Sequence, residues 1–213
     1  MTDPYIPTLA SFTFTRREKK AIAAAMLTAK PWGEKNDDIA AAKASIRALH
    51  LARRGSTCCY CCTNLFGGGP FMTDREHVLP KRKYKAYTFE VWNLSVSCKR
   101  CNMALKGEKD GFVVDKSATA PFQDSTNYRL IHPNFDDWEK HLMREMSQIN
   151  MKVVVKFTVV GDSAKGTYTH TFFKLRELET DSYDKAQGIV RTPPQSLSEG
   201  ALEAKAIARD TGQ

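Results

Sequence analysis

One short stretch of the chain, residues 75–102, gathers residue types that can move protons and bind cations. It reads REHVLPKRKYKAYTFEVWNLSVSCKRCN and holds Glu76 beside His77, Asn93 in a Trp-Asn-Leu triplet, and Asn102 directly after a Cys-x-x-Cys pair. An imidazole can take a proton from water near neutral pH, and carboxylate and amide oxygens bind hard divalent cations. The stretch therefore has the side chains for metal-assisted acid–base chemistry.

The cysteines predict a second metal site. All six lie between positions 58 and 101, and the later Cys-x-x-Cys pair is Cys98 with Cys101. The earlier group contains two overlapping pairs of equal spacing, Cys58 with Cys61 and Cys59 with Cys62. Four thiolates at such spacing are typical of a closed tetrahedral zinc site, which leaves no position open for water. The sequence thus predicts a structural zinc ion with two candidate pairs for its first half.

Positive charge concentrates around the same stretch. The chain has a net charge of +8, and residues 75–106 hold eight basic and two acidic side chains. A basic surface beside candidate catalytic groups favours a polyanionic partner such as nucleic acid. The predicted phosphate contacts are Lys81, Arg82, Lys83, Lys85, Lys99, Arg100 and Lys106.

The composition, with 42% hydrophobic and 26% charged residues, indicates neither a disordered chain nor a membrane protein. The longest apolar run, AIAAAMLTA, is far shorter than the roughly 20 residues that a spanning helix needs. The first residues, MTDPYIPTLASF, lack the basic and apolar regions of a secretory signal. We therefore expect a cytoplasmic protein in a reducing compartment, where paired cysteines bind metal more often than they form disulfides.

Two helices are predicted before the cysteines. Thr15 and Glu18 form a capping box that opens a helix ending before Pro31. A second helix, capped by Asn36 or Asp37, ends at Gly55. It has a stripe expected to be buried, Ile39, Ile46, Leu49 and Leu51, and arginines expected to stay in solvent, Arg47, Arg53 and Arg54.

The central stretch is expected to form two strands and a helix. The first strand spans Phe71 to Leu79, the second is NLSVS, and the helix CNMALKG closes at Gly107. Further on, NFDDWEKHLMREMSQ is predicted to be a helix, and MKVVVKFTVV is predicted to pair with GTYTHTFFKL across GDSAK. His50, His132, His141 and His170 are expected to be structural.

Three motifs of the stretch resemble those of the HNH nuclease family. They are EHVLPK, WNL and CKRCNMALKG, with a Cys-x-x-Cys pair upstream, and they cover residues 58–107. The resemblance implies an α+β fold with a ββα-metal core and a four-cysteine zinc knuckle, flanked by N-terminal helices and a C-terminal helix plus β-hairpin. It also favours Cys58 and Cys61 as the first half of the zinc site. The implied organisation is an N-terminal helical segment over 1–54, the nuclease core over 55–110, an accessory helix and hairpin over 111–190, and a tail over 191–213.

The same resemblance implies a role for each polar residue. His77 would be the general base, Glu76 and Asn102 would bind a catalytic Mg²⁺ or Mn²⁺, and Asn93 would orient the histidine and its loop. Asp74 is an alternative ligand on the face of the strand that carries Glu76. Glu76 stands where many relatives have Asp, and Asn102 where the third letter of HNH is His. The implied reaction is hydrolysis of DNA phosphodiesters to 5′-phosphate and 3′-hydroxyl ends.

The segment YRLIHPNFDDWEKHL is similar to small bacterial HNH proteins encoded beside ATPase partners in anti-phage systems of the Septu and retron type. This resemblance implies an ATPase partner and a role in antiviral defence. The alternative to an endonuclease is a non-catalytic zinc module that binds nucleic acid or protein. Such a module needs the four cysteines and the basic loop, but not Glu76, His77 and Asn102.

Overall fold

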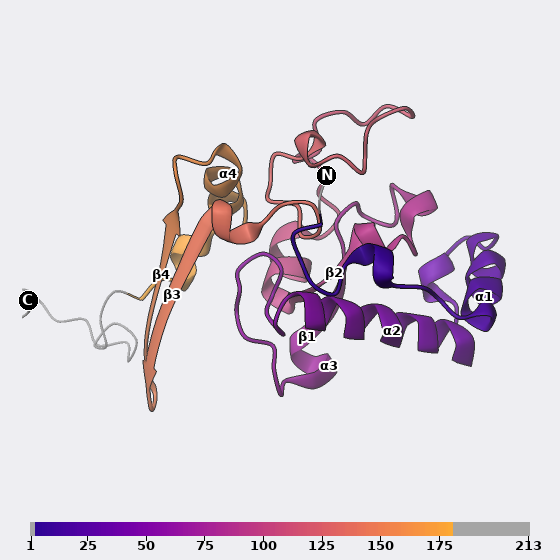
Figure 1. Ribbon diagram of the computed structural model, residues 1–213, viewed down its shortest axis with the longest axis horizontal. Helices are drawn as coiled ribbons and strands as arrows, with labels where there is room; N and C mark the ends of the chain where they lie inside the picture. The colour runs from indigo at the N-terminus through magenta and orange to yellow at the C-terminus, as the bar shows by residue number, and fades with distance from the viewer. Residues whose placement is uncertain (1–2, 181–213) are drawn as a thin grey trace, which may run out of the picture. The chain divides into compact units, whose positions relative to one another are not determined.

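The computed structural model describes residues 3–180 and has a mixed α+β architecture (Figure 1). The helices are α1 (Arg16–Met26), α2 (Asp37–Arg53), α3 (Gly69–Met72), α4 (Ala164–Phe172) and a segment of wider π geometry, Arg100–Lys106. The strands are β1 (Thr73–His77), β2 (Leu94–Cys98), β3 (Leu142–Ile149) and β4 (Lys152–Val159). Single 3₁₀ turns occupy Leu9–Ser11, Pro31–Gly33, Lys85–Tyr87, Val91–Asn93, Ser125–Asn127, Trp138–Lys140 and Leu175–Leu178.

The chain divides into two compact units. Of the described residues, 3–145 and 155–179 belong to the first, and 146–154 with 180 belong to the second. The predicted tail over 191–213 and the end of the predicted accessory segment lie outside the described residues. No helix within 3–180 combines the length and the apolar character needed to cross a membrane.

Helices α1 and α2 begin where their capping residues predict. The Thr15 hydroxyl accepts a hydrogen bond from the Glu18 N–H, and the Glu18 carboxylate accepts one from the Thr15 N–H, so the capping box is confirmed. The Asn36 side chain accepts from the Ile39 N–H at 2.8 Å and starts α2. Helix α1 ends at Met26, earlier than predicted.

A buried apolar cluster joins these helices to the central sheet. Ile39 and Ile46 of α2 pack with Ala25 of α1, with Leu94 of β2 and with Phe89 from the loop before β2. Figure 1 shows α2 running beside the β1–β2 pair, with α1 across its far end. The N-terminal helices therefore form part of the core that supports β2.

The expectation that Arg53 and Arg54 stay in solvent is wrong. Both are buried, with 4% and 8% of their surface exposed. The Arg53 guanidinium pairs with the Asp3 carboxylate at 2.8 Å, and that of Arg54 lies 4.6 Å from the centre of the Tyr5 ring. A carboxylate and an aromatic face compensate the burial of a guanidinium, so the first residues of the chain pack on the end of α2.

Strands β1 and β2 pair antiparallel, and their register brings the polar residues of the central stretch together. His77 lies opposite Leu94, Glu76 opposite Ser95, and Thr73 opposite Cys98. Strand β1 is shorter than predicted, since α3 occupies Gly69–Met72. The helix after β2 ends at Gly107, whose φ of 51° is one that glycine adopts without strain.

Two predictions for the C-terminal half are wrong. NFDDWEKHLMREMSQ forms the turn Trp138–Lys140 and then β3, whereas GTYTHTFFKL forms most of α4. β3 pairs with β4 across a tight turn at Asn150, whose φ is 54°. The Ser163 side chain then caps α4 by accepting a hydrogen bond from the Gly166 N–H at 3.0 Å. The strand that pairs with β4 is β3, which precedes β4 in the chain, and not the segment that follows it. The hairpin therefore comes before α4.

Gly166 allows α4 to pack directly on the backbone at His141. A Cβ added at Gly166 would overlap the His141 carbonyl oxygen, whereas a Cβ added at Gly111 would have no atom within 4 Å. Gly166→Ala should lower the free energy of unfolding by about 1–3 kcal/mol, because backbone overlap outweighs the gain in helix propensity. Gly111→Ala should change it by less than about 0.5 kcal/mol. Urea unfolding of both variants measures this, and a Gly166→Ala protein as stable as the wild type would contradict the packing described.

Candidate functional site

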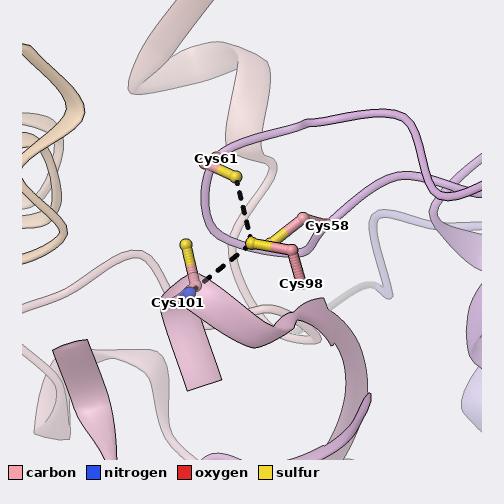
Figure 2. A group of neighbouring side chains, drawn as sticks. All are labelled: Cys58, Cys61, Cys98 and Cys101. Atoms are coloured by element: carbon pink, nitrogen blue, oxygen red, sulfur yellow. Dashed lines mark hydrogen bonds between the residues drawn. The ribbon is translucent and has the colours of Figure 1, made fainter. Parts of the chain in front are cut away.

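Four cysteines from two distant segments converge on one point. Cys58 and Cys61 lie in a tight turn after α2, Cys98 ends β2, and Cys101 lies in the helix Arg100–Lys106. Figure 2 shows the four side chains gathered around a common centre. Their sulfur atoms all lie within 4.8 Å of one another, which confirms that these four residues form one group able to hold a metal ion.

The geometry of this group fits tetrahedral coordination. The Cys61 and Cys98 sulfurs are 3.8 Å apart, and a tetrahedron with metal–sulfur bonds of about 2.3 Å has edges of about 3.8 Å. The Cys98 sulfur also accepts the backbone N–H of Cys101 at 3.5 Å. Burial raises the pKa of the Cys58 thiol well above its usual range, so a cation is needed to hold it as thiolate at neutral pH.

The alternative pair stands outside this group. Cys59 is buried, and its backbone N–H donates to the Val96 carbonyl at 3.0 Å, which ties the turn to β2. The Cys62 sulfur faces the Arg54 guanidinium at 3.9 Å, and burial raises the pKa of this thiol to about 11. The positions of the sulfur atoms therefore confirm that Cys58 and Cys61, and not Cys59 and Cys62, lie with Cys98 and Cys101.

Glu76 is held in a buried ion pair. Its side chain is fully buried, and Oε1 lies 2.7 Å from the Lys106 ammonium and accepts the Tyr60 hydroxyl at 3.1 Å. Lys106 also donates to the His77 carbonyl at 2.7 Å. Burial raises the pKa of Glu76, and the charge of Lys106 opposes that rise. The second oxygen, Oε2, is buried without a hydrogen-bond partner among residues 3–180.

His77 has one ring nitrogen anchored and one free. Its Nε2 lies 3.0 Å from the Thr88 carbonyl oxygen, an acceptor, so Nε2 carries the proton and Nδ1 has the lone pair. Nδ1 makes no hydrogen bond to the described part of the chain. Burial, with the positive charge of Lys81, lowers the pKa of His77 to about 3. The imidazole is therefore neutral at pH 7, and Nδ1 keeps an unused lone pair.

His77 and Asn102 line the same small cleft, of about 60 Å³, together with Arg75, Lys81 and Lys106. The Asn102 amide nitrogen donates to the Asp74 carboxylate at 3.2 Å, which leaves the amide oxygen free to bind a cation. Glu76 does not line the cleft, because Lys106 covers it. The structure thus brings together two of the predicted catalytic residues and places Glu76 behind a lysine.

Asn93 closes the loop between β1 and β2. Its Oδ1 accepts the Leu79 N–H at 2.7 Å, and its Nδ2 donates to the carbonyls of Leu79 and Tyr87. Thr88, whose carbonyl anchors His77, directly follows Tyr87. Asn93 therefore fixes the backbone that orients the imidazole and does not itself line the cleft.

The predicted phosphate contacts differ in what they can reach. Lys81, Arg82, Lys83, Lys85 and Lys99 are exposed. Arg82 pairs with Glu108, Lys83 with Asp110, and Lys99 with Asp74. Arg100 instead donates to the carbonyls of Phe173 and Lys174, and Lys106 is buried against Glu76. Lys106 borders the cleft but is only 1% exposed, and its ammonium is engaged by the Glu76 carboxylate and the His77 carbonyl, so it is not available as a surface phosphate contact.

The remaining histidines lie away from the cleft. His50 and His132 are fully buried, and His141 Nδ1 lies 2.7 Å from the Ser163 hydroxyl that caps α4. His170 lies on α4, not on a strand as predicted. Sequence reasoning missed Trp32, whose ring centre is 4.5 Å from that of His77. No motif marks Trp32, and only the fold brings its segment to the cleft.

A scan against models of known protein families and a search among curated proteins both find no match.

The two cysteine pairs predict a sharp difference between variants. Wild-type protein should carry about one metal ion per chain, and Cys58→Ser should lose it and unfold at a lower temperature. The matched control, Cys62→Ser, should keep the ion because its sulfur lies outside the group. Elemental analysis of the purified proteins by mass spectrometry measures this. Equal metal content in Cys58→Ser and wild type would show that the four cysteines are not the site.

The buried ion pair predicts a pH-dependent loss of stability. Lys106→Met leaves the Glu76 carboxylate unpaired and should cost about 3–5 kcal/mol of unfolding free energy at pH 7. With the lysine gone, the pKa of Glu76 in the folded state rises further above its ordinary value of 4.5. Because the protonated form suits a buried site, the loss should shrink as the pH falls below that folded-state value. Urea unfolding at several pH values measures it.

The control for this prediction is the double variant Glu76→Gln with Lys106→Met, which removes the carboxylate and its counterion together. It should be more stable than Lys106→Met alone at pH 7, and the difference between the two should vanish near pH 4, a value on the order of the ordinary carboxyl pKa. If the single variant is as stable as the wild type at pH 7, the ion pair does not have the role described.

Proposed function

We propose that the chain is a metal-dependent DNA endonuclease of the HNH type, with a structural zinc ion in the group of four cysteines. The observation that carries the proposal is the state of His77. Its Nε2 is anchored to the Thr88 carbonyl, and its free Nδ1 belongs to a residue that lines a cleft with Asn102. The pKa of about 3 keeps this imidazole neutral, and the negative charge of a bound phosphate would raise that pKa toward the range in which a histidine activates water.

Zinc suits the cysteine group better than other common metals. Thiolates favour soft or borderline ions, and four of them in a tetrahedral arrangement fill the coordination sphere of Zn²⁺. Such an ion would tie the turn at Cys58 and Cys61 to the end of β2 and to the helix that begins next to Cys101. Asn102 follows Cys101 directly, so the ion would fix one wall of the cleft.

The proposed reaction is hydrolysis of a DNA phosphodiester. His77 Nδ1 takes the proton of the attacking water, and the Thr88 carbonyl holds the ring while it becomes charged. The Asn102 amide oxygen would bind a divalent cation such as Mg²⁺ or Mn²⁺. When bound, that cation would stabilise charge on the attacked phosphate and on the departing 3′ oxygen.

Two carboxylates are candidates for the second cation ligand. Glu76 has an unpartnered Oε2, but its side chain is fully buried and paired with Lys106. Asp74 is partly exposed, and one of its oxygens lies 3.2 Å from the Asn102 amide nitrogen. Asp74 does not line the cleft either, and it is paired with Lys99 at 3.2 Å. Because that pair lies at the surface, it costs less to break than the buried pair of Glu76 with Lys106, so Asp74 is the favoured candidate.

A non-catalytic zinc module that binds nucleic acid or protein is the second candidate. The observation that favours it is that Glu76 is bound by Lys106 and Tyr60. These contacts give the carboxylate a structural role, so its presence is explained without catalysis. This candidate explains the cysteine group and the exposed Lys81 and Lys85. It gives no account of the free nitrogen of His77 in a polar cleft.

A plasmid assay separates the two candidates. With Mg²⁺ or Mn²⁺, the zinc-loaded protein should nick or linearise supercoiled plasmid, and EDTA should stop it. His77→Ala should lower the rate at least about 100-fold, because the general base is lost. His170→Ala, on α4 outside the cleft, is the matched control and should keep the wild-type rate. Folded, zinc-loaded protein that binds the plasmid but never cleaves it would favour the binding module.

A further inference from the structure

A second cavity, of about 330 Å³, opens beside the cleft of His77. Residues 29–33, before α2, form one side of it, with Trp32 as its aromatic wall. The Lys43 ammonium and the Arg75 guanidinium lie over the Trp32 ring, 5.2 Å and 6.0 Å from its centre, and neither residue lines the cavity. Lys81, Arg82 and Lys85 contribute to the other side. The cavity thus combines an aromatic surface with cations, and its size lies at the lower end of small-molecule sites, which span roughly 300–1,000 Å³.

This cavity shares lining residues with the candidate catalytic cleft. Lys81 and Glu108 line both. Thr88 also lines the cavity, and its carbonyl oxygen accepts the hydrogen bond of His77 Nε2. The Trp32 and His77 rings meet edge to face, with their centres 4.5 Å apart. A group bound against Trp32 would therefore lie next to any phosphate attacked through His77.

The aromatic wall is held in place before any ligand binds. The Lys43 ammonium donates to the Trp32 carbonyl at 2.8 Å and to the Glu34 carbonyl at 3.2 Å, which fixes the turn on α2. Pro31 is buried, and the Phe89 ring centre lies 5.2 Å from that of Trp32. Little ordering cost is left for a ligand, because the turn is already fixed.

The charges around the cavity suit a phosphate-bearing ligand. Lys81 and Lys85 are exposed and make no ion pair within residues 3–180. The acidic group at the rim, Glu108, is compensated by Arg82 at 3.2 Å. Two uncompensated cations next to an aromatic wall are the combination with which proteins bind single-stranded nucleic acid.

We propose that this cavity binds the base of an unpaired nucleotide adjacent to the scissile phosphate. A base stacked on Trp32 inside the cavity cannot keep its partner in a duplex, so the preferred substrate is DNA with an unpaired nucleotide at the cut, either single-stranded or extrahelical. The position beside a scissile phosphate rests on the proposed nuclease function, whereas the binding site itself rests on the cavity, the ring and the cations.

Binding is measured with the full-length, zinc-loaded His77→Ala protein without added Mg²⁺ or Mn²⁺ and without chelator, so that nothing is cut and the structural ion is kept. Fluorescently labelled DNA duplexes carry either one extrahelical thymidine or an extrahelical abasic nucleotide at the same place, and a perfect duplex and a single strand complete the set. The base-bearing duplex should bind roughly 5- to 150-fold more tightly than the abasic one, which corresponds to about 1–3 kcal/mol for one stacked base. Equal affinity for the two would overturn the proposal.

The variants Trp32→Phe and Trp32→Leu, made in the His77→Ala protein, test the wall itself. Trp32→Phe keeps a stacking face and should keep most of the discrimination, whereas Trp32→Leu should abolish it while binding the perfect duplex as before. Trp32→Leu weakening all four DNAs equally would contradict the proposal. If Trp32→Leu fails to fold, the comparison of base-bearing and abasic duplexes with the His77→Ala protein, which keeps Trp32, still tests the proposal.

The same set of DNAs separates this inference from the nuclease proposal. Cleavage by wild-type protein in Mg²⁺ without discrimination between base-bearing and abasic DNA would overturn the inference and leave the nuclease intact. Discrimination in binding without any cleavage would support the cavity as a base-binding site and count against the nuclease. DNA bound in the cavity should quench the fluorescence of Trp32, because the other two tryptophans, Trp92 and Trp138, are buried. Loss of this quenching in Trp32→Phe would assign the contact to the Trp32 ring.

Discussion

The convergence of four thiols at one point is the constraint on which the rest of the central region depends. The segments that supply them, the turn after α2 and the junction of β2 with the following helix, are far apart in sequence. Burial disfavours an isolated thiolate, so a bound cation is what would hold the four cysteines in their charged form. Such a cation would tie the turn after α2 to the end of β2 and to the helix that starts at Arg100 and carries Asn102 and Lys106.

Lys106 extends this constraint to β1. One ammonium group binds both the side chain of Glu76 and the carbonyl of His77, so the end of β1 is held against the end of the helix. Removing either charge leaves the other unpaired in a buried site that solvent does not reach. The stability of the strand and the position of the imidazole therefore depend on the same contact. A residue type that sequence reasoning assigns to phosphate binding is here the support of the cleft.

The local features of the fold were predictable from sequence, and the non-local ones were not. The capping box at Thr15, the end of the helix at Gly107 and the two Cys-x-x-Cys pairs depend on spacing within short segments. The burial of Arg53 depends on Asp3, and the pairing of β4 depends on β3, which was mistaken for a helix because its residues also fit a helical pattern. For the site, the motif supplied His77, Asn93 and Asn102. Nothing local in the sequence indicates that Lys106 covers Glu76 or that Trp32 faces His77.

Substrate selection and water activation would depend on different parts of the chain. The cleft residues come from one compact stretch, and phosphate contacts made by exposed lysines carry no information about base or strand structure. The Trp32 wall comes from the turn between α1 and α2, which Lys43 of α2 fixes. If the chain is a nuclease, a change in that turn would alter which DNA fits beside His77 and would leave the residues proposed to activate water unchanged. On the proposed function, the N-terminal helices would do more than support β2, since the turn between them would form the surface that binds a substrate nucleotide.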